Sequence, residues 1–330
     1  MNYIICGMTS LRYFLPLINE AKKEGHQVHK VFLMKTGKYN CPLSNSKNNQ
    51  EIHRWAAMSG FSVHQVSEIK DHPGLTFMVE ADGVKHLGAQ HTKVSMTYMT
   101  DFRHLYNRYL DSCDYIIFPS EAFASHYGCL SEKNLYFGST KYDYNFSKEN
   151  RLEEITKTSN EKALIIYPRY RDLHKLSLKD IISTVRELGY DAIIKYRMKE
   201  PVKESYGCEI VCDEYWYPHV TLDLINQSKF VINTGSTTMK ESILLKKPIV
   251  SLNIKPEIHL PFLSGYNFEE SLTVGEISGK SLKTAITKLL SRSESYEFDK
   301  CIHEKLFQPG ETSKKILKFY FTSNNDPHFM

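Results

Sequence analysis

Short apolar segments alternate with helical patterns along this chain, and that alternation constrains the fold more than any other feature. The apolar segments of the first half lie at 3–6, 28–33, 94–98 and 115–118. Apolar residues recur at helical spacing in the segments 14–21, 102–110 and 121–127. Short apolar strands separated by helices predict a parallel, doubly wound sheet with helices on both faces.

The second half of the chain repeats this alternation after residue 162. Its predicted strands are 163–167, 192–195, 230–233 and 249–252, and its predicted helices are 178–188, 222–227 and 239–245. The charged segment 147–162 lies between the two rounds and holds few apolar residues, which is typical of a domain boundary. We therefore predict two Rossmann-like α/β domains, residues 1–150 and 151–330, that face a cleft.

The composition is that of a soluble globular chain. Its 330 residues are 41% hydrophobic and 24% charged, and no apolar run reaches the roughly 20 residues that a membrane helix needs. The N-terminus lacks the charged region and cleavage site of a signal peptide, so we expect a cytoplasmic protein. The net charge of +4 is small and the Lys and Arg residues are dispersed, which argues against a nucleic-acid surface and suits an anionic small ligand.

The cysteines and histidines form no metal-binding pattern. The seven cysteines are scattered, and Cys208 and Cys212 have no second pair to complete a zinc site. None of the 14 histidines occurs in a recognised ligand spacing. We therefore expect free thiols, no metal and no bound cofactor.

The segment 229–252 indicates a buried strand, a small-residue loop and a helix start in direct succession. The loop holds Gly235, Ser236, Thr237 and Thr238, and Glu241 follows about one helical turn later. Backbone N–H groups at such a position can bind a phosphate, and Glu241 could accept hydrogen bonds from a ribose. The alternative is an ordinary strand-to-helix turn that Ser and Thr cap, and the loop alone does not decide between the two.

Five segments, in chain order, carry a resemblance to a known family. They are DYIIFPSE at 114–121, FGSTKYD at 137–143, LIIYPRYR at 164–171, NTGSTT at 233–238 with Glu241 and Pro248, and QPGETSKKI at 308–316. Together they resemble the GT-B glycosyltransferase-like enzymes, in the branch of the CDP-glycerol glycerophosphotransferases and UDP-N-acetylglucosamine 2-epimerases. The resemblance implies an acceptor-side first domain, a nucleotide-donor second domain, and a last helix that crosses back to the first.

The chain departs from both named subfamilies. The family's K-x-H-P strand end is KYRM at 195–198 here, and its H-G pair corresponds to Thr100 and Asp101. The H-R-x-E-N motif of the 2-epimerases is absent. These departures favour a sugar transferase that uses a carboxylate.

Transfer from a nucleotide-sugar needs a base that deprotonates the acceptor hydroxyl. Asp101 follows a predicted central strand, where its carboxylate could act as the base of an inverting displacement. Asp101 could also cap the helix that begins near Phe102, and the two roles are compatible. His104 and His53 are the alternative bases, and a surface or packing role is the alternative for each.

The departing diphosphate needs positive groups. Arg169, Arg171 and Lys195 lie at predicted strand ends and could bind it, the arginines through a fork that matches phosphate oxygens. Ion pairs with Asp172 or Glu200 are the alternative. Because cations and backbone amides can take the place of a metal, we expect no Mg²⁺.

Two aromatic residues and two N-terminal residues complete the predicted site. Trp216 or Tyr217 could stack on a nucleobase or sugar, or could pack against helices. Gly7 and Thr9 are expected on the acceptor side.

The predicted function is transfer of a sugar or polyol phosphate from a nucleotide-activated donor to a glycan or lipid-linked acceptor, without a metal. A nucleotide-sugar 2-epimerase is one alternative, and a non-catalytic nucleotide-binding protein of the same fold is another. Lys179, Lys199 and Lys203 are candidates for peripheral contact with the inner face of a membrane that carries the acceptor.

Overall fold

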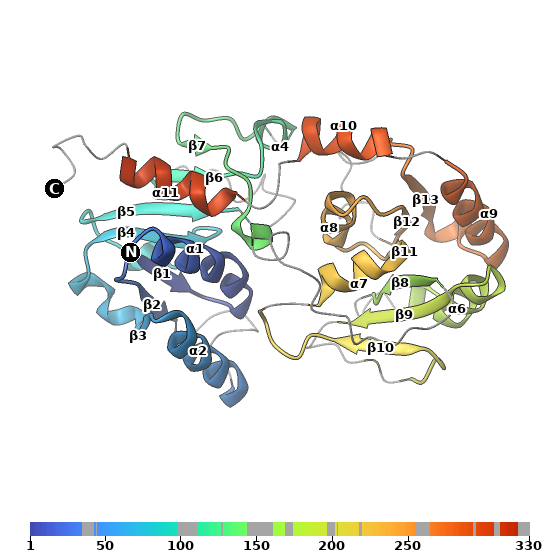
Figure 1. Cartoon of the computed structure of the whole chain (residues 1–330), viewed down its shortest axis with the longest axis horizontal. Coiled ribbons are helices and arrows are strands. Elements are labelled where there is room, and N and C mark those ends of the chain that lie inside the picture. The colour runs from blue at the N-terminus through green and yellow to red at the C-terminus, as the bar shows by residue number, and fades with distance from the viewer. Residues whose placement is uncertain are drawn as a thin grey trace. The chain divides into compact units, whose positions relative to one another are not determined.

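The chain divides into two compact units (Figure 1). The computed structural model describes residues 1–34, 43, 45–97, 111–126, 128–143, 161–168, 174–196, 202, 204–217, 220–254, 265–292, 295–306 and 311–322. Unit 1 holds residues 1–148, 215–218 and 306–330, and unit 2 holds residues 149–214 and 219–305. Residues 215–217 therefore belong to unit 1 although the chain on both sides belongs to unit 2.

Unit 1 is built on a parallel sheet of seven strands with the order β3-β2-β1-β4-β5-β6-β7. The strands are β1 (Asn2–Ile5), β2 (Lys30–Leu33), β3 (Ser62–Gln65), β4 (Gly74–Val79), β5 (His91–Met96), β6 (Tyr115–Ile117) and β7 (Asn134–Leu135). The helices are α1 (Leu11–Lys23), α2 (Ser46–Ser59), α4 (Glu121–His126) and α11 (Thr312–Thr322), with 3-10 turns η1 (Met8–Ser10), η2 (Val66–Asp71), η3 (Val84–His86) and η4 (Thr140–Tyr142).

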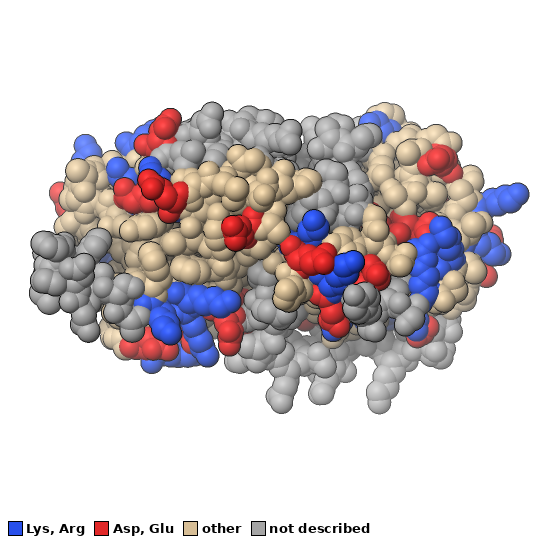
Figure 2. Space-filling view, turned by 90° about the horizontal axis from the view of Figure 1, so that it is seen from above, with Lys and Arg blue, Asp and Glu red and all other residues tan. Residues whose placement is uncertain are grey.

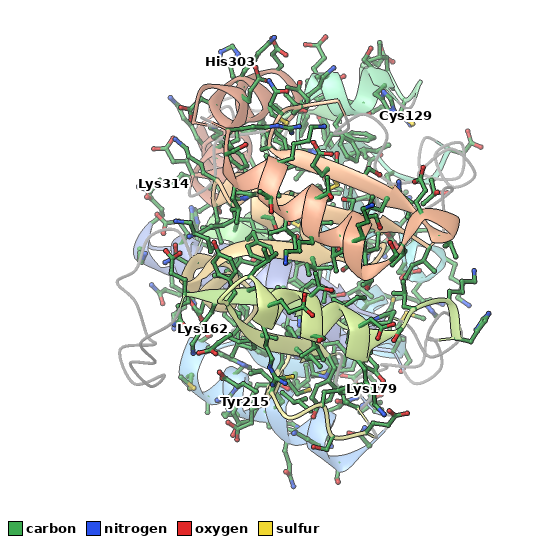
Figure 3. The ribbon with its side chains drawn as sticks, turned by 90° about the vertical axis from the view of Figure 1, so that its right-hand side faces the viewer. Cys129, Lys162, Lys179, Tyr215, His303 and Lys314 are labelled. Carbon is green, nitrogen blue, oxygen red and sulfur yellow. The ribbon has the colours of Figure 1, made fainter. Side chains whose placement is uncertain are left out.

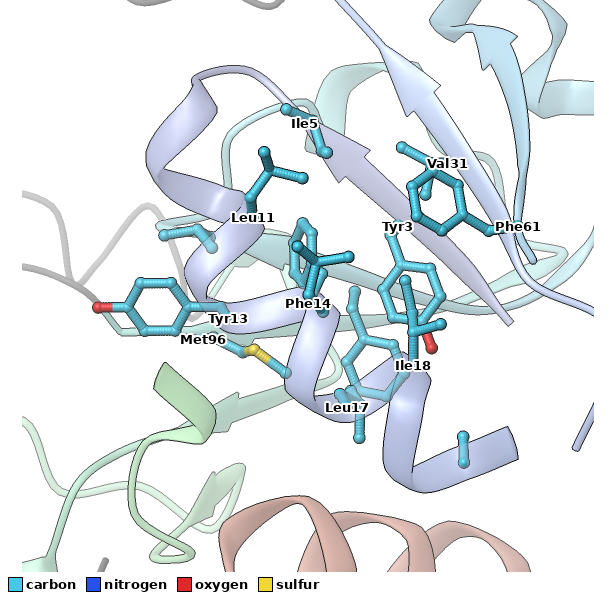
Figure 4. Close-up of a cluster of buried hydrophobic side chains, with 14 of the residues drawn as sticks. Tyr3, Ile5, Leu11, Tyr13, Phe14, Leu17, Ile18, Val31, Phe61 and Met96 are labelled. Carbon is cyan, nitrogen blue, oxygen red and sulfur yellow. The ribbon is translucent and has the colours of Figure 1, made fainter. Parts of the chain in front are cut away.

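The core of unit 1 forms where the apolar face of α1 meets the sheet. Figure 4 shows Phe14, Leu17 and Ile18 of α1 beside Tyr3 of β1, and all four are buried. The Tyr3 ring lies 5.3 Å from the Phe14 ring and 5.6 Å from the Phe77 ring of β4. Burial raises the pKa of the Tyr3 hydroxyl. The helical spacing of α1 and the alternation along the strands therefore converge on one apolar layer.

The C-terminal helix α11 belongs to this same core. Its Ile316, Leu317 and Tyr320 are buried in the cluster that holds Tyr3 and Phe14. Because these residues recur at helical spacing, α11 buries one face and leaves Lys314, Lys315 and Lys318 exposed on the other.

A buried carboxylate fixes the start of α11. Asp143 Oδ1 accepts a hydrogen bond from the Thr312 backbone N–H at 3.1 Å. Its Oδ2 accepts from the Ser313 N–H and from the Ser313 hydroxyl, both at 2.6 Å. Burial raises the pKa of Asp143, and these hydrogen bonds oppose the rise. Two segments that carry the family resemblance, 137–143 and 308–316, thus meet through Asp143 and Ser313.

Unit 2 is built on a parallel sheet of six strands with the order β10-β9-β8-β11-β12-β13. The strands are β8 (Lys162–Ile166), β9 (Asp191–Tyr196), β10 (Glu209–Cys212), β11 (Ser228–Asn233), β12 (Ile249–Asn253) and β13 (Glu269–Thr273). The helices are α6 (Leu178–Glu187), α7 (Thr221–Gln227), α8 (Thr238–Leu244), α9 (Gly279–Leu290) and α10 (Ser295–Lys305), with the 3-10 turn η8 (Val274–Glu276).

Both faces of the unit 2 sheet are covered. On one face Ile165 and Ile232 pack in a cluster with residues of α6 and α9. On the other face Leu164 and Val231 pack with Leu224 and other residues of α7. Successive strand residues point to opposite faces, so a run such as Leu164–Ile165 must be apolar throughout.

Both sheets reverse their strand order at one point, between β1 and β4 in unit 1 and between β8 and β11 in unit 2. This reversal is the topology of doubly wound nucleotide-binding folds, in which ligands bind outside the carboxyl ends of the strands at the switch point. The predicted fold class, two doubly wound parallel-sheet α/β domains, is confirmed. Residues 215–218 and 306–330 also group with unit 1. The family resemblance implied such a return for the last helix, whereas the sequence did not predict one at 215–218.

Candidate functional site

The predicted donor loop follows β11 at the switch point of unit 2. Thr234 anchors the loop because its hydroxyl donates to the Ile166 carbonyl at the end of β8, at 2.7 Å. Asn233 folds the loop back on itself: its side chain accepts from the Ser236 N–H and donates to the Ser236 carbonyl, both at 3.1 Å. A paired Asn side chain of this kind replaces backbone hydrogen bonds in a tight turn.

Gly235 occupies a backbone conformation that favours glycine, with φ of +75°. A Cβ atom at this position would have no described heavy atom within 4 Å, apart from its chain neighbours. With respect to the described residues, the backbone at Gly235 is therefore open on the side where a side chain would project. A ligand could approach the peptide groups closely there.

The remaining loop residues connect Gly235 to α8. The Ser236 hydroxyl lies 2.9 Å from the Thr238 hydroxyl and accepts from the Thr238 N–H at 3.3 Å. Thr237 is half-buried, and in the described structure its side chain makes no capping hydrogen bond. Glu241 lies about one turn into α8 and is only 3% exposed. Its predicted contact with a ribose stays a prediction.

Lys195 forms a buried ion pair rather than standing alone at its strand end. Its ammonium group lies 2.6 Å from Asp213 Oδ2 and donates to the Tyr196 carbonyl at 3.0 Å. Asp213 Oδ1 in turn accepts from the Val220 N–H at 2.8 Å. The sequence suggested Asp172 or Glu200 as an ion-pair partner, whereas the partner in the structure is Asp213. Two of the three donors of the Lys195 ammonium group are thus used, and its charge is balanced by Asp213.

Four predicted site residues, Asp101, His104, Arg169 and Arg171, lie outside the described residues. Their predicted roles in catalysis and diphosphate binding therefore stay predictions. The alternative base His53 is exposed on α2. On the acceptor side, Gly7 precedes η1 and its carbonyl accepts from the Ser10 N–H at 2.9 Å, and Thr9 lies within η1.

The aromatic segment 215–217 lies in unit 1 instead of forming a nucleobase loop of unit 2. Tyr217 is 1% exposed in the unit 1 core, with its ring 5.3 Å from the Trp55 ring in an edge-on contact. Its ring therefore has no free face for a base, and of the two predicted roles the structure shows packing. Trp216 is half-buried and packs against the same cluster.

A turn that sequence reasoning did not single out lies at the switch point of unit 1. Glu80 and Ala81 follow β4 and adopt φ values of +55° and +52°, which are rare for residues other than glycine. The Ser95 hydroxyl accepts from the Ala81 N–H at 2.9 Å, and both Glu80 and Ala81 are buried. Strained backbone of this kind clusters at functional sites. The sequence gives only a weak signal, the Asp82-Gly83 pair typical of turns.

Charge and metal-ligating groups are dispersed in the described part of the chain. Figure 2 shows basic and acidic side chains interspersed over one face. Among the described residues no group of three or more His, Cys, Asp or Glu side chains could hold a metal ion. Six cysteines are described, and all six are free thiols. Lys179 is exposed on α6 (Figure 3), while Lys199 and Lys203 lie outside the described residues.

No helix in the described part of the chain has the length and apolar character needed to cross a bilayer. The prediction of peripheral membrane contact has no further support from these residues.

Neither a protein-family profile nor a curated protein sequence matches this chain. Solved structures do match along almost its whole length. The glycotransferase of kitacinnamycin is 10% identical with a TM-score of 0.64, and the match covers 96% of this chain and 97% of that chain. The UDP-GlcNAc 2-epimerase from Neisseria meningitidis bound to UDP-GlcNAc is 13% identical with a TM-score of 0.61, over 98% of this chain and 100% of that chain.

The wall teichoic acid polymerase TagF is also similar, at 13% identity and a TM-score of 0.62, over 100% of this chain and 90% of that chain. At identities this low, likeness of structure shows the fold and does not assign a reaction. The similar structures include a glycosyltransferase and a UDP-GlcNAc 2-epimerase, which are classes that the sequence resemblance named, and a polymerase. The chain therefore has the GT-B fold, with two parallel-sheet α/β domains.

Proposed function

We propose that this protein is a glycosyltransferase that moves a sugar or polyol phosphate from a nucleotide-activated donor to a glycan or lipid-linked acceptor. The observation that carries the proposal is the position of the loop 234–238, which leaves β11 at the switch point of the unit 2 sheet. Ligands of doubly wound sheets bind at this position. Two similar structures were solved with UDP-GlcNAc and with UDP.

In the proposed complex the donor diphosphate lies over Gly235, where the backbone is open. We assign the N–H groups of Gly235 and Thr237 as its donors. The neighbouring amides of Ser236 and Thr238 are engaged, since Ser236 N–H donates to Asn233 and Thr238 N–H donates to the Ser236 hydroxyl. The Asn233 clamp would hold the loop in its bound conformation before the ligand arrives, which lowers the entropy cost of binding.

The proposed reaction is a displacement at the carbon that carries the diphosphate, for a sugar donor. Asp101 takes the proton of the acceptor hydroxyl, and the acceptor oxygen forms a bond to that carbon. The bond from the carbon to the diphosphate oxygen breaks, and the leaving oxygen keeps the electron pair. Arg169 and Arg171 balance the charge that develops on the diphosphate. Because Lys195 is paired with Asp213, we assign the main part of diphosphate binding to the two arginines.

A thermal-shift panel of UDP, GDP, CDP, CMP and TDP, with and without EDTA, tests the donor assignment. A ligand at 100 times its Kd adds about 2.7 kcal/mol to the free energy of unfolding. The proposal predicts a shift with one nucleotide that EDTA leaves unchanged. No shift with any nucleotide would contradict the donor site, and a shift that EDTA abolishes would contradict a metal-independent reaction.

Turnover separates transfer from the two alternatives. The nucleotide that binds identifies the donor class. The assay then measures how much of that nucleotide the wild type and Asp101→Asn release from the donor when glycan acceptors are present. The proposal predicts release by the wild type, and loss of release with retained nucleotide binding in Asp101→Asn. Conversion of UDP-GlcNAc to its 2-epimer would favour the epimerase. Binding without any turnover would favour the non-catalytic protein.

A further inference from the structure

The segment 213–217, called the strap below, leaves the unit 2 sheet and ends in unit 1. Its first residue, Asp213, directly follows β10 and is 7% exposed. The Asp213 carboxylate is held on both oxygens, by the Lys195 ammonium and by the N–H of Val220, where the chain is again part of unit 2. The root of the strap is therefore fixed within unit 2 by a buried charge pair.

The tip of the strap, residues 215–217, is fixed within unit 1 by Glu51 of α2. Glu51 Oε1 accepts from the Trp216 N–H at 2.8 Å and from the Tyr217 N–H at 3.2 Å. Glu51 is only 3% exposed. Hydrogen bonds from two consecutive amides to one buried carboxylate are charge-assisted, and such bonds are about twice as strong as neutral ones.

Further contacts surround these two bonds. The Trp216 indole N–H donates to Asn48 Oδ1 at 3.1 Å, and the Trp216 carbonyl accepts from Arg12 Nε at 2.7 Å. The Arg54 guanidinium lies 4.0 Å from the centre of the Tyr215 ring. Every residue of the tip thus contacts α1 or α2 through a polar group or a ring, in addition to the burial of Tyr217.

We propose that the strap is a fixed tether and that Glu51 is its positioning residue, so that the tip moves as a part of unit 1 and the root as a part of unit 2. Three residue steps separate Asp213 from Trp216, and they span at most about 11 Å between Cα atoms. The root and the tip of the strap are therefore joined by a short stretch of chain.

The charge on Glu51 makes its positioning role separable from general stability. Burial raises the pKa of Glu51, and the two amides and the charges of Arg54 and Arg12 oppose the rise. Glu51→Gln keeps an oxygen acceptor and the shape of the side chain but removes the charge that strengthens the two hydrogen bonds. Its direct effect should therefore fall on the two strap amides, whereas the apolar packing of the unit 1 core is unchanged.

Amide hydrogen exchange, resolved by residue, tests the tether in the full-length protein. We expect the Trp216 and Tyr217 amides to exchange about 100-fold faster in Glu51→Ala and about tenfold faster in Glu51→Gln than in the wild type. The amides of the central strands β1 and β4 should keep their wild-type rates. Glu68→Gln is the matched control, because Glu68 is a unit 1 carboxylate that accepts from a backbone N–H, that of Gln65, at 3.1 Å.

Three results would overturn the proposal. The strap amides of the wild type could already exchange as fast as unfolded peptide, which would mean that the tip is not fixed. Their rates could stay unchanged in both Glu51 variants, which would remove Glu51 as the positioning residue. All unit 1 amides could accelerate together in Glu51→Gln, which would make Glu51 an ordinary stabilising residue. If Glu51→Ala does not fold, Glu51→Gln alone decides between these outcomes.

Discussion

Replacing Glu269 by Gln should remove a pH-dependent loss of stability from unit 2. Glu269 is the first residue of β13 and is 9% exposed. Burial raises its pKa to about 7, the charge of Glu270 adds to the rise, and the Ser251 side chain opposes it. The carboxylate is thus held where its charged form is poorly solvated.

The sign and size of the effect follow from proton linkage. A raised pKa means that the folded chain holds the proton more tightly than the unfolded chain, so stability falls as pH rises from about 4.5 to about 7. A pKa difference of about 2.5 units corresponds to about 3 kcal/mol in the free energy of unfolding. Glu269→Gln is neutral at every pH and escapes this loss.

Urea denaturation between pH 4 and pH 8 measures the difference between the variant and the wild type. Both tryptophans, Trp55 and Trp216, lie in unit 1, so unfolding of unit 2 is followed by circular dichroism. The stability advantage of Glu269→Gln should grow by about 3 kcal/mol between pH 4 and pH 8. The exposed Glu187→Gln in the same unit is the control and should show no such growth. An advantage for Glu269→Gln that stays constant across this range would refute the reasoning.

Three further predictions concern named contacts. Lys246 follows α8 with φ of +53° and forms an exposed ion pair with Asp299. Because both substitutions remove the ion pair and only glycine adopts this φ without strain, Lys246→Gly should be about 1 kcal/mol more stable than Lys246→Ala. Equal urea midpoints of the two variants would argue against backbone strain at this position. Asp143→Ala should lower the free energy of unfolding of unit 1 by about 2 kcal/mol, because it removes the acceptor of three hydrogen bonds at the start of α11. Tryptophan fluorescence during urea denaturation measures this loss. An unchanged urea midpoint would contradict the capping role of Asp143. Lys195→Met should lower the free energy of unfolding by about 3 kcal/mol, because it leaves the buried Asp213 charge without its cation. The double variant Lys195→Met/Asp213→Asn should recover part of that loss when unfolding is followed by circular dichroism. A double variant less stable than Lys195→Met would contradict the ion-pair account.

The sequence predicted the fold well because its signal is local. Apolar runs such as 163–167 and 230–233 are long enough to indicate buried strands, and helices lie between them. Parallel pairing and a doubly wound order follow from that alternation alone. The strap was missed because its position depends on Glu51, which precedes Trp216 by 165 residues in the chain. No local sequence pattern around 215–217 indicates that Glu51 binds this segment.

Individual site residues were less predictable than the elements that carry them. The loop 234–238 was found because small residues between a strand and a helix leave a local signature. Lys195 lies near a strand end as predicted, but its partner, Asp213, directly follows the neighbouring strand β10, and this proximity depends on the order of strands in the sheet. The turn at Glu80 and Ala81 carries no glycine at its two left-handed positions, so the usual sequence signal for such a backbone is missing.

Nucleotide binding by a loop variant tests the central claim most directly. Thr237 is half-buried, and in the described structure it lends no side-chain cap to α8, so Thr237→Trp should fill the space of the proposed diphosphate without removing a contact of the loop. Isothermal titration is carried out with the nucleotide that shifts the wild type, on Thr237→Trp and on Thr287→Trp, an exposed threonine of α9. The account predicts wild-type affinity in Thr287→Trp and a loss of at least about tenfold, or about 1.4 kcal/mol, in Thr237→Trp. Wild-type affinity in both variants would contradict the assignment of the donor to this loop.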